Sequence, residues 1–240
     1  MGLLPKFLKN LISNRPLPAT ANAWPRGLRD YMANKRRLPG STPLAEVRFV
    51  VFDSETSGLD LSKNRLLSIA GVAMAGPEVQ LDDAFEAMVV QTDVGGANAA
   101  VVHGLVSNDL ADGLPEDEAA ARFLAFAGDA VLVAHHAAFD IQMLRKAIAS
   151  HRGAKVWNPT IDTAQLAERV EVGPMSSSRA AGTNQSAAYR LDNLVERYGI
   201  DLAERHTAAG DALATALLFQ RLLKKAERRG IHTLGDLLAR

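Results

Sequence analysis

The stretch VRFVVFDSETSGLD, residues 47–60, decides the fold and locates the first candidate site. Its β-branched and aromatic run, VRFVVFD (47–53), predicts a strand. Side chains two apart on a strand project to the same face, so Asp53 and Glu55 present their carboxylates together. Two neighbouring anions repel unless a cation lies between them, and hard oxygen ligands favour Mg²⁺ or Mn²⁺. The alternative is a strand end with solvated acids, which is the commoner meaning of an isolated D-x-E.

The segments that follow predict a mixed α/β sheet. Residues 66–74 (LLSIAGVAM) and 84–91 (AFEAMVVQ) read as two more strands joined by short loops, which indicates an antiparallel meander. Helical and strand patterns then alternate, which indicates parallel additions to the same sheet. A small, polar stretch, 173–188, is expected to be a flexible insertion. The later elements are expected as helix 115–128, strand 130–135, helix 139–150, strand and helix 160–170, and helices 191–199 and 207–230.

A second motif, LVAHHAAFD (132–140), places Asp140 at the start of a helix after a buried strand. In open α/β sheets, ligands lie at the carboxyl ends of strands, so Asp140 faces the same crevice as the acids of the first strand. It is a candidate third ligand. The alternative is a helix cap, because aspartate is favoured at helix N-termini. His135 and His136 are neighbours on a strand and point to opposite faces, so one of them is expected to be structural.

A third motif, RHTAAGDA (205–212), lies where a loop enters the long final helix. His206 precedes the helix and Asp211 lies in its first turns. This arrangement fits a division of labour in which the histidine takes a proton and the aspartate holds metal. The alternative is a helix start with a solvated histidine.

Composition limits the class of protein and the kind of metal site that the chain can form. The chain has 240 residues, 48% of them hydrophobic and 22% charged, which suits one sizeable core. Without cysteine, any metal must be held by oxygen or imidazole, and a reducing cytoplasmic setting is permitted. No apolar run reaches the roughly 20 residues of a membrane span, and the N-terminus lacks a cleavable signal, so a soluble protein that is not exported is expected.

The charge is unevenly distributed. Residues 1–46 contain eight Lys or Arg and two acids (8 − 2 = +6), and the remainder of this neutral chain therefore carries −6. A basic arm beside an acidic, metal-binding body suits a polyanionic substrate. The alternative is a solvated helix pair that covers part of the domain.

The three motifs, in this order, resemble those of the DnaQ-like 3′-5′ exonucleases of the DEDDh group. That group includes the proofreading epsilon subunit of DNA polymerase III, oligoribonuclease and ribonuclease T. The resemblance covers residues 47–225. VHGL (102–105) and TIDTAQLAERV (160–170) also resemble segments that these enzymes place before and after the second motif. Each motif is modest, but the ordered set is specific.

The resemblance implies a ribonuclease H-like fold, with three antiparallel strands followed by parallel ones. It implies that two divalent cations, Mg²⁺ or Mn²⁺, are held by Asp53, Glu55, Asp140 and Asp211, and that His206 is the general base. Thr56, His103 and Phe139 fall where family members contact the terminal nucleotide. The chain departs from the family pattern at three positions, where asparagine, an aliphatic or small residue, and threonine are more usual: His136, Ser54 and Ser57.

The expected activity is removal of nucleoside 5′-monophosphates from a single-stranded DNA 3′ end, of proofreading or repair type. An exoribonuclease that trims RNA is the alternative, because recognition of a 2′-OH cannot be deduced from the sequence. A non-catalytic nucleic-acid-binding module is a further alternative, although such a module has no need of four mutually repelling carboxylates. With no long tail after the last helix, a stand-alone or accessory enzyme is expected rather than a polymerase subunit. The expected domains are a basic extension (1–46), an exonuclease domain (47–229) and a helical end (230–240).

Overall fold

The computed structural model describes residues 17–58, 60–91, 110–172, 187–202 and 205–239. One five-stranded sheet has the order β3-β2-β1-β4-β5. The first three strands pair antiparallel, and β4 and β5 join β1 in parallel. The predicted mixed sheet is therefore confirmed. Its strands are β1 (Arg48–Thr56), β2 (Leu66–Ala75), β3 (Glu78–Met88), β4 (Val131–Ala134) and β5 (Thr160–Asp162).

Two strands differ from the predicted bounds by three residues or more. β1 continues to Thr56, so both acids of the first motif lie inside a paired strand, Asp53 opposite Ala70 and Glu55 opposite Ser68. The prediction of a strand over 84–91 was wrong at both ends, because β3 spans Glu78–Met88. The early part of β3 is polar, and it pairs with β2 as soon as the turn at Gly76 (φ 55°) reverses the chain. An edge strand needs little apolar sequence, so its first residues carry a weak strand signal.

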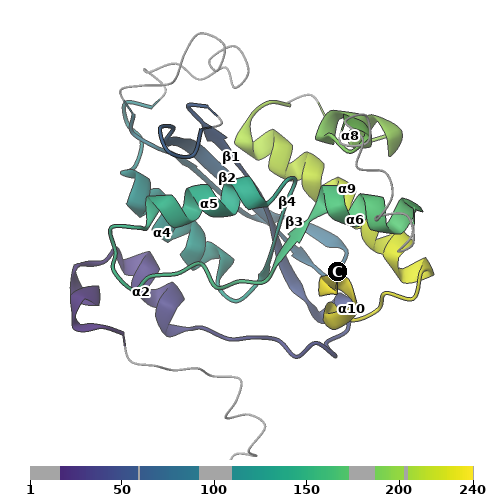
Figure 1. Ribbon diagram of the computed structural model, residues 1–240, viewed down its shortest axis with the longest axis horizontal. Coiled ribbons are helices and arrows are strands. Elements are labelled where there is room, and N and C mark those ends of the chain that lie inside the picture. The colour runs from purple at the N-terminus through teal and green to yellow at the C-terminus, as the bar shows by residue number, and fades with distance from the viewer. Residues whose placement is uncertain (1–16, 59, 92–109, 173–186, 203–204, 240) are drawn as a thin grey trace, which may run out of the picture.

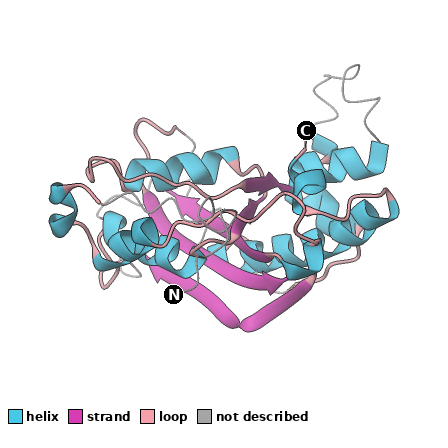
Figure 2. Cartoon of the chain, turned by 90° about the horizontal axis from the view of Figure 1, so that it is seen from below, coloured by secondary structure: helices cyan, strands magenta, loops and turns pink. Residues whose placement is uncertain are grey.

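Helices cover both faces of the sheet (Figures 1 and 2). One layer comprises α2 (Arg26–Ala33), α4 (Glu116–Ala127) and α5 (Ala138–Ala147). The other comprises α6 (Thr163–Val172), α8 (Leu191–Arg197) and α9 (Ala208–Arg228), with α10 (Leu234–Leu238) near its end. Two short 3₁₀ helices, η1 (Ala19–Ala23) and η2 (Leu44–Glu46), lie in the N-terminal segment.

The two helical layers bury two separate cores, and β1 contributes to both by strict alternation. Val50 and Phe52 pack in the core of the α4 and α5 layer, whereas Phe49 and Val51 pack in the core of the α6 and α9 layer. Alternation along a strand therefore continues from the core into the acidic motif. Asp53 and Glu55 follow the face of Phe49 and Val51, toward α9.

The N-terminal segment packs on the domain rather than standing apart from it. Leu28 and Tyr31 of α2 are buried in the core that α4 and α5 share. Gly27 permits this contact, because a Cβ there would lie 2.7 Å from the carbonyl oxygen of Ala121 in α4. Tyr31 also donates a hydrogen bond to Asn158, which in turn donates to the carbonyl of Ala130 just before β4. The helix α2 therefore lies near the amino ends of the parallel strands, away from their carboxyl ends (Figure 1).

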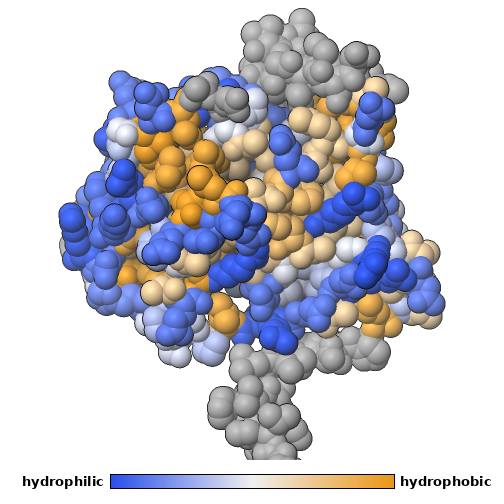
Figure 3. All heavy atoms as spheres, turned by 180° about the vertical axis from the view of Figure 1, so that it is seen from behind, coloured by the Kyte–Doolittle hydropathy of each residue, from blue (hydrophilic) through white to orange (hydrophobic). Residues whose placement is uncertain are grey.

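The face opposite to that of Figure 1 shows apolar patches bordered by polar side chains (Figure 3). Apolar atoms contribute a large part of any folded surface, so exposure alone gives these residues no binding role. Among the helices of the described ranges, none combines the length and the apolar character that crossing a membrane needs. The exposed large apolar residues of the described chain are Leu38, Leu81, Val90, Val172 and Leu238.

Candidate active site

Three carboxylates meet at the carboxyl end of β1. Asp53 and Glu55 come from the strand, and Asp211 comes from the first turn of α9, which packs against the same face of the sheet. One ligand oxygen from each of the three lies within 4.8 Å of the other two. The pairing of β1 with β2 shifts register between Glu55 and Thr56. Such irregularities bend a strand and re-aim its side chains.

Asp140 approaches the same strand from the opposite face. It lies in the first turn of α5, is only 5% exposed, and accepts a hydrogen bond from the Ser54 hydroxyl. Ser54 follows the face of Phe52, toward α5, as alternation requires. Asp140 is not one of the three mutually close carboxylates, but its charge still acts on Asp53 and Glu55. The four predicted carboxylates thus surround the end of β1 from both sides.

Burial and mutual repulsion make these acids hard to ionise. Burial raises the pKa of Glu55 to about 7, and the charges of Asp211 and Asp140 add to the effect. The pKa of Asp53 is raised well above its ordinary value by burial and by Asp140, Glu55 and Asp211. Burial likewise raises the pKa of Asp140 to about 7, against the hydrogen bond from Ser54. Buried, competing anions of this kind are the oxygen ligands that a hard divalent cation would neutralise, so the donor set fits Mg²⁺ or Mn²⁺.

The third motif forms a strained loop end before α9. His206 is exposed and has a positive φ of 66°, which costs free energy in a non-glycine residue. Its backbone N–H donates to Oδ1 of Asp211 over 3.3 Å. Thr207 then caps the helix, since its hydroxyl accepts from the Gly210 N–H at 3.0 Å. The loop therefore presents His206 to solvent beside the acids.

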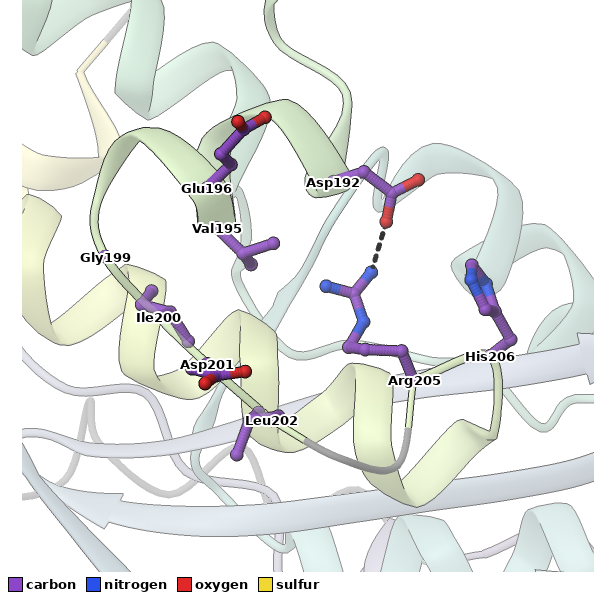
Figure 4. A pocket seen from close by; sticks show the side chains of 9 residues that line it. All are labelled: Asp192, Val195, Glu196, Gly199, Ile200, Asp201, Leu202, Arg205 and His206. Carbon is purple, nitrogen blue, oxygen red and sulfur yellow. Dashed lines mark hydrogen bonds and ion pairs between the residues drawn. The ribbon is translucent and has the colours of Figure 1, made fainter.

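A cavity of about 510 Å³ lies between α8 and this loop (Figure 4). Arg205 lies between α8 and His206 in this cavity and points toward Asp192 of α8 (Figure 4). The cavity is therefore next to the predicted general base but is lined by α8 and the loop rather than by the carboxylates of β1. Its lining residues are Asp192, Val195, Glu196, Gly199, Ile200, Asp201, Leu202, Arg205 and His206.

The turn between β4 and α5 is held by β5 and α6. His135 is buried and its Nδ1 lies 2.9 Å from the Thr163 hydroxyl; burial is the main cause that lowers its pKa to about 4. His136 has a positive φ of 56° and is exposed. Its N–H donates to Asp162, which also caps α6 through the Ala164 N–H. His135 is thus buried and hydrogen-bonded, but the predicted reason was wrong: both histidines lie in the turn after β4 ends at Ala134, and their rings contact each other with centroids 4.5 Å apart.

The three residues predicted to contact the terminal nucleotide differ in burial and in whether the structure describes them. The Thr56 side chain is buried and its hydroxyl donates to the carbonyl of Gly58 at 2.8 Å. Phe139 is half-buried and packs against the core of the α4 and α5 layer. His103, the VHGL segment and most of the predicted insertion lie outside the described residues.

Sequence reasoning missed two contacts of the site. Arg205 donates from Nε to Oδ1 of Asp211 at 2.6 Å, and Ser54 donates to Asp140. The position of Ser54 between Asp53 and Glu55 was a signal for the second contact, because alternation directs it to the face of α5. The arginine is adjacent to His206 in sequence, but its partners depend on how α8 and α9 are placed.

The comparisons with known proteins agree with this arrangement. Residues 50–219 match the family model RNase_T, described as Exonuclease. A DNA polymerase III subunit epsilon-like protein from Rhodobacter capsulatus is 35% identical over 200 residues, which are 82% of this chain and 27% of that protein. A PolC-type DNA polymerase III from Halalkalibacterium halodurans is 33% identical over 190 residues, 79% of this chain and 12% of that protein. This chain therefore spans about a quarter or less of the length of these two relatives.

Solved structures share the fold at low identity. E. coli exonuclease I in complex with a dA16 oligonucleotide aligns with a TM-score of 0.60 at 16% identity, covering 76% of this chain and 42% of that one. Exonuclease X in complex with 5′ overhanging duplex DNA aligns with a TM-score of 0.56 at 19% identity, covering 80% and 99%. The predicted resemblance is confirmed: the chain belongs to the RNase_T exonuclease family and carries a DnaQ-like, epsilon-like exonuclease domain of ribonuclease H-like fold.

Proposed function

We propose that the chain is a metal-dependent 3′-5′ exonuclease that hydrolyses DNA from a single-stranded 3′ end and releases nucleoside 5′-monophosphates. The observation that carries this proposal is the cluster of Asp53, Glu55 and Asp211 oxygens within 4.8 Å of one another. Asp140 supports it from the other face of the strand, within electrostatic range of Asp53 and Glu55. Carboxylates crowded at one strand end repel one another, and a bound cation would relieve that repulsion.

The four carboxylates would hold two divalent cations, Mg²⁺ or Mn²⁺. When bound, the ions would supply charge neutralisation at the scissile phosphate and lower the pKa of an attacking water. The protein's own contribution is to fix the ligand oxygens before the substrate arrives. β1 does so for Asp53 and Glu55, which lie in the paired part of the strand, and the first turns of α5 and α9 do so for Asp140 and Asp211.

His206 would act as the general base. Its exposed ring at the entrance of α9 can be reached by water, and imidazole is the side-chain group that most often serves as a general base. The water oxygen would bond to phosphorus, its proton would pass to the His206 imidazole, and the phosphorus–O3′ bond would break. The electron pair of that bond stays with O3′, which takes a proton from solvent. The product is a nucleoside 5′-monophosphate.

Thr56, Phe139 and His103 would contact the terminal nucleotide. Phe139 directly precedes Asp140 and could offer its ring to a base, because aromatic rings stack on bases without sequence preference. Since the Thr56 hydroxyl donates to Gly58, its main chain and methyl group are the parts left to meet the nucleotide. DNA is the proposed substrate because the two curated relatives are both named for DNA polymerase III.

Matched oligonucleotides test the proposal. A single-stranded DNA labelled at its 5′ end should shorten stepwise in Mn²⁺ or Mg²⁺, whereas a 3′ label should be released at once as a mononucleotide. EDTA should abolish both signals, and an RNA of the same sequence should be degraded more slowly. His206→Ala should reduce turnover by about 10²- to 10⁴-fold, the usual worth of a general base.

Three outcomes would each contradict a different part of the proposed function: the polarity, the substrate or the catalytic activity. Immediate release of the 5′ label would reverse the polarity, and faster degradation of RNA would change the substrate. Absence of mononucleotides with either cation and either nucleic acid would favour a non-catalytic binding module.

A further inference from the structure

Arg205 joins three parts of the candidate active site. Its Nε donates to Oδ1 of Asp211 at 2.6 Å, and its terminal nitrogen donates to Oδ1 of Asp192 in α8 at 2.7 Å. Only 16% of the Arg205 side chain is exposed, as for Asp211, whereas 67% of Asp192 is exposed. The guanidinium therefore spans from a solvent-facing carboxylate on α8 to a shielded one on α9.

The contacts at Asp211 share one oxygen. Oδ1 accepts both from Arg205 and from the backbone N–H of His206. Two donors on one oxygen restrict the rotation of the carboxylate, and the charged donor makes its hydrogen bond a strong one. An oxygen of this carboxylate lies within 4.8 Å of an oxygen of Asp53 and of Glu55. In metal sites, such outer partners orient the ligand oxygens and influence affinity.

The same contacts restrain the neighbouring histidine. His206 follows Arg205 directly and holds a positive φ of 66°, a conformation that persists only when its surroundings impose it. The side chain of Arg205 anchors one side of that residue to both helices, and the Thr207 cap anchors the other side to α9. The strained backbone is thus held at both ends.

We propose that Arg205 is a positioning residue, which holds the Asp211 carboxylate toward Asp53 and Glu55 and fixes the backbone of His206, with Asp192 as its anchor. This inference rests on the proposed function and deepens it. Arginine suits the position because its planar fork donates in two directions at once, whereas a lysine ammonium is a compact point charge. The wall of the cavity in Figure 4 is therefore tied directly to the proposed catalytic loop.

Titration with Mn²⁺ alone tests the inference without any turnover. Isothermal calorimetry of the full chain should show that Arg205→Ala weakens Mn²⁺ binding by about 10- to 100-fold, the usual effect of losing an outer partner. Asp192→Asn, an exposed change that the fold should tolerate, should weaken it by a smaller factor. Arg197→Ala is the matched control, because Arg197 pairs α8 with Glu171 of α6 at 2.8 Å, an ion pair with neither partner among the proposed ligands. Its Mn²⁺ affinity should stay within about twofold of wild type.

Kinetics provide a second readout. For Arg205→Ala, kcat should fall while the KM for a DNA oligonucleotide stays close to wild type, and excess Mn²⁺ should restore part of the lost turnover. A merely structural loss would not respond to Mn²⁺ in this way. Arg205→Lys should recover only part of the affinity, since it cannot reproduce both directed contacts.

Three results would overturn the inference or part of it. Unchanged Mn²⁺ affinity in Arg205→Ala would remove the positioning role, and tighter affinity would show that the arginine competes with the cation. Wild-type affinity in Asp192→Asn would refute the anchor. Failure of the proposed function is distinguishable, because a wild-type chain that releases no mononucleotides can still be titrated with Mn²⁺.

Discussion

The helices α5 and α9 bring one aspartate each to opposite faces of β1, and they hold it by different means. Asp140 of α5 is almost fully buried, and the side-chain donor it is given is the neutral hydroxyl of Ser54. Asp211 of α9 is partly exposed and is paired with a charged guanidinium and a backbone N–H. The carboxylate of the α5 half is therefore held by burial and a neutral donor, and that of the α9 half by ionic and backbone contacts with a loop.

The difference assigns separate tasks to the two halves. A buried carboxylate beside a neutral donor is costly to ionise, so the α5 half has the most to gain from a bound cation. An ion pair that spans a loop end keeps the proposed base near the acids while leaving its ring exposed. Both halves nevertheless depend on β1, whose alternation sends Ser54 to one face and its acidic neighbours to the other.

The largest expected effects come from neutralising either aspartate, and the melting temperature should then distinguish the two halves. Asp140→Asn and Asp211→Asn should each reduce turnover by about 10³-fold, because several kcal/mol of cation-dependent stabilisation are lost. In EDTA at pH 8, however, Asp140→Asn should raise the melting temperature, since the amide can still accept from Ser54 and no buried charge remains. Asp211→Asn should not raise it, because Arg205 loses the negative charge of one of its two carboxylate partners. Thermal unfolding followed by circular dichroism measures both.

Asp82→Asn on the edge strand β3 is the matched control, an exposed acid outside the site. Its melting temperature and turnover should both stay at wild-type values. If Asp140→Asn and Asp211→Asn shifted the melting temperature equally, the proposed contrast between buried and paired carboxylates would be wrong.

The next largest effect should be the change of melting temperature with pH in the cation-free protein. The pKa values of Glu55 and Asp140 are raised to about 7 in the fold, so the native state keeps protons that the unfolded chain releases above its ordinary carboxyl pKa near 4. Their stabilising contribution is fully present below pH 4 and is lost as pH rises through 7. The melting temperature in EDTA should therefore fall between pH 6.5 and 8, and Mn²⁺ should restore it.

His135 acts with the opposite sign at lower pH. Its pKa is lowered to about 4, so its contribution is present above the unfolded value near 6.5 and is lost as pH falls toward 4. The range above pH 6.5 is therefore the clearest for the carboxylates. Glu55→Gln should flatten the curve there, and a melting temperature that rose with pH in EDTA would refute the assignment.

Much of this arrangement could be predicted from the sequence, because it follows from alternation and from residue order. The direction of Asp53 and Glu55, and the helix starts at Asp140 and Asp211, are local consequences of strand and helix geometry. The amino end of β3 could not be predicted, since a solvent-facing edge strand has no apolar pattern to mark it. Nor could the partners of Arg205, because Asp192 and Asp211 come together only when α8 and α9 are placed.

Removing the Ser54 hydroxyl, which donates to Asp140 in the α5 half, should have a moderate effect on turnover. Ser54→Ala removes the donor to Asp140 without changing the fold of β1, and turnover should fall by about 10-fold, at the lower end of the range for an outer partner. Ser57→Ala is the control, since its hydroxyl accepts from the Arg65 N–H in the neighbouring turn rather than serving Asp140. Steady-state kinetics at saturating Mn²⁺ compare the two, and equal losses would contradict a specific role for Ser54.

The smallest expected effect concerns how the two helices begin. Thr207 caps α9 with its hydroxyl, whereas the N-cap of α5 is Ala137, a buried residue whose side chain has no acceptor. Thr207→Ala should therefore lower the free energy of unfolding by about 1 kcal/mol, measured by urea denaturation, and Thr207→Ser should preserve most of it. Because the cap contact is local to the start of α9, the alanine variant should also increase hydrogen exchange there and leave α5 unchanged. Equal unfolding free energies for the alanine and serine variants would mean that packing alone fixes both helix starts.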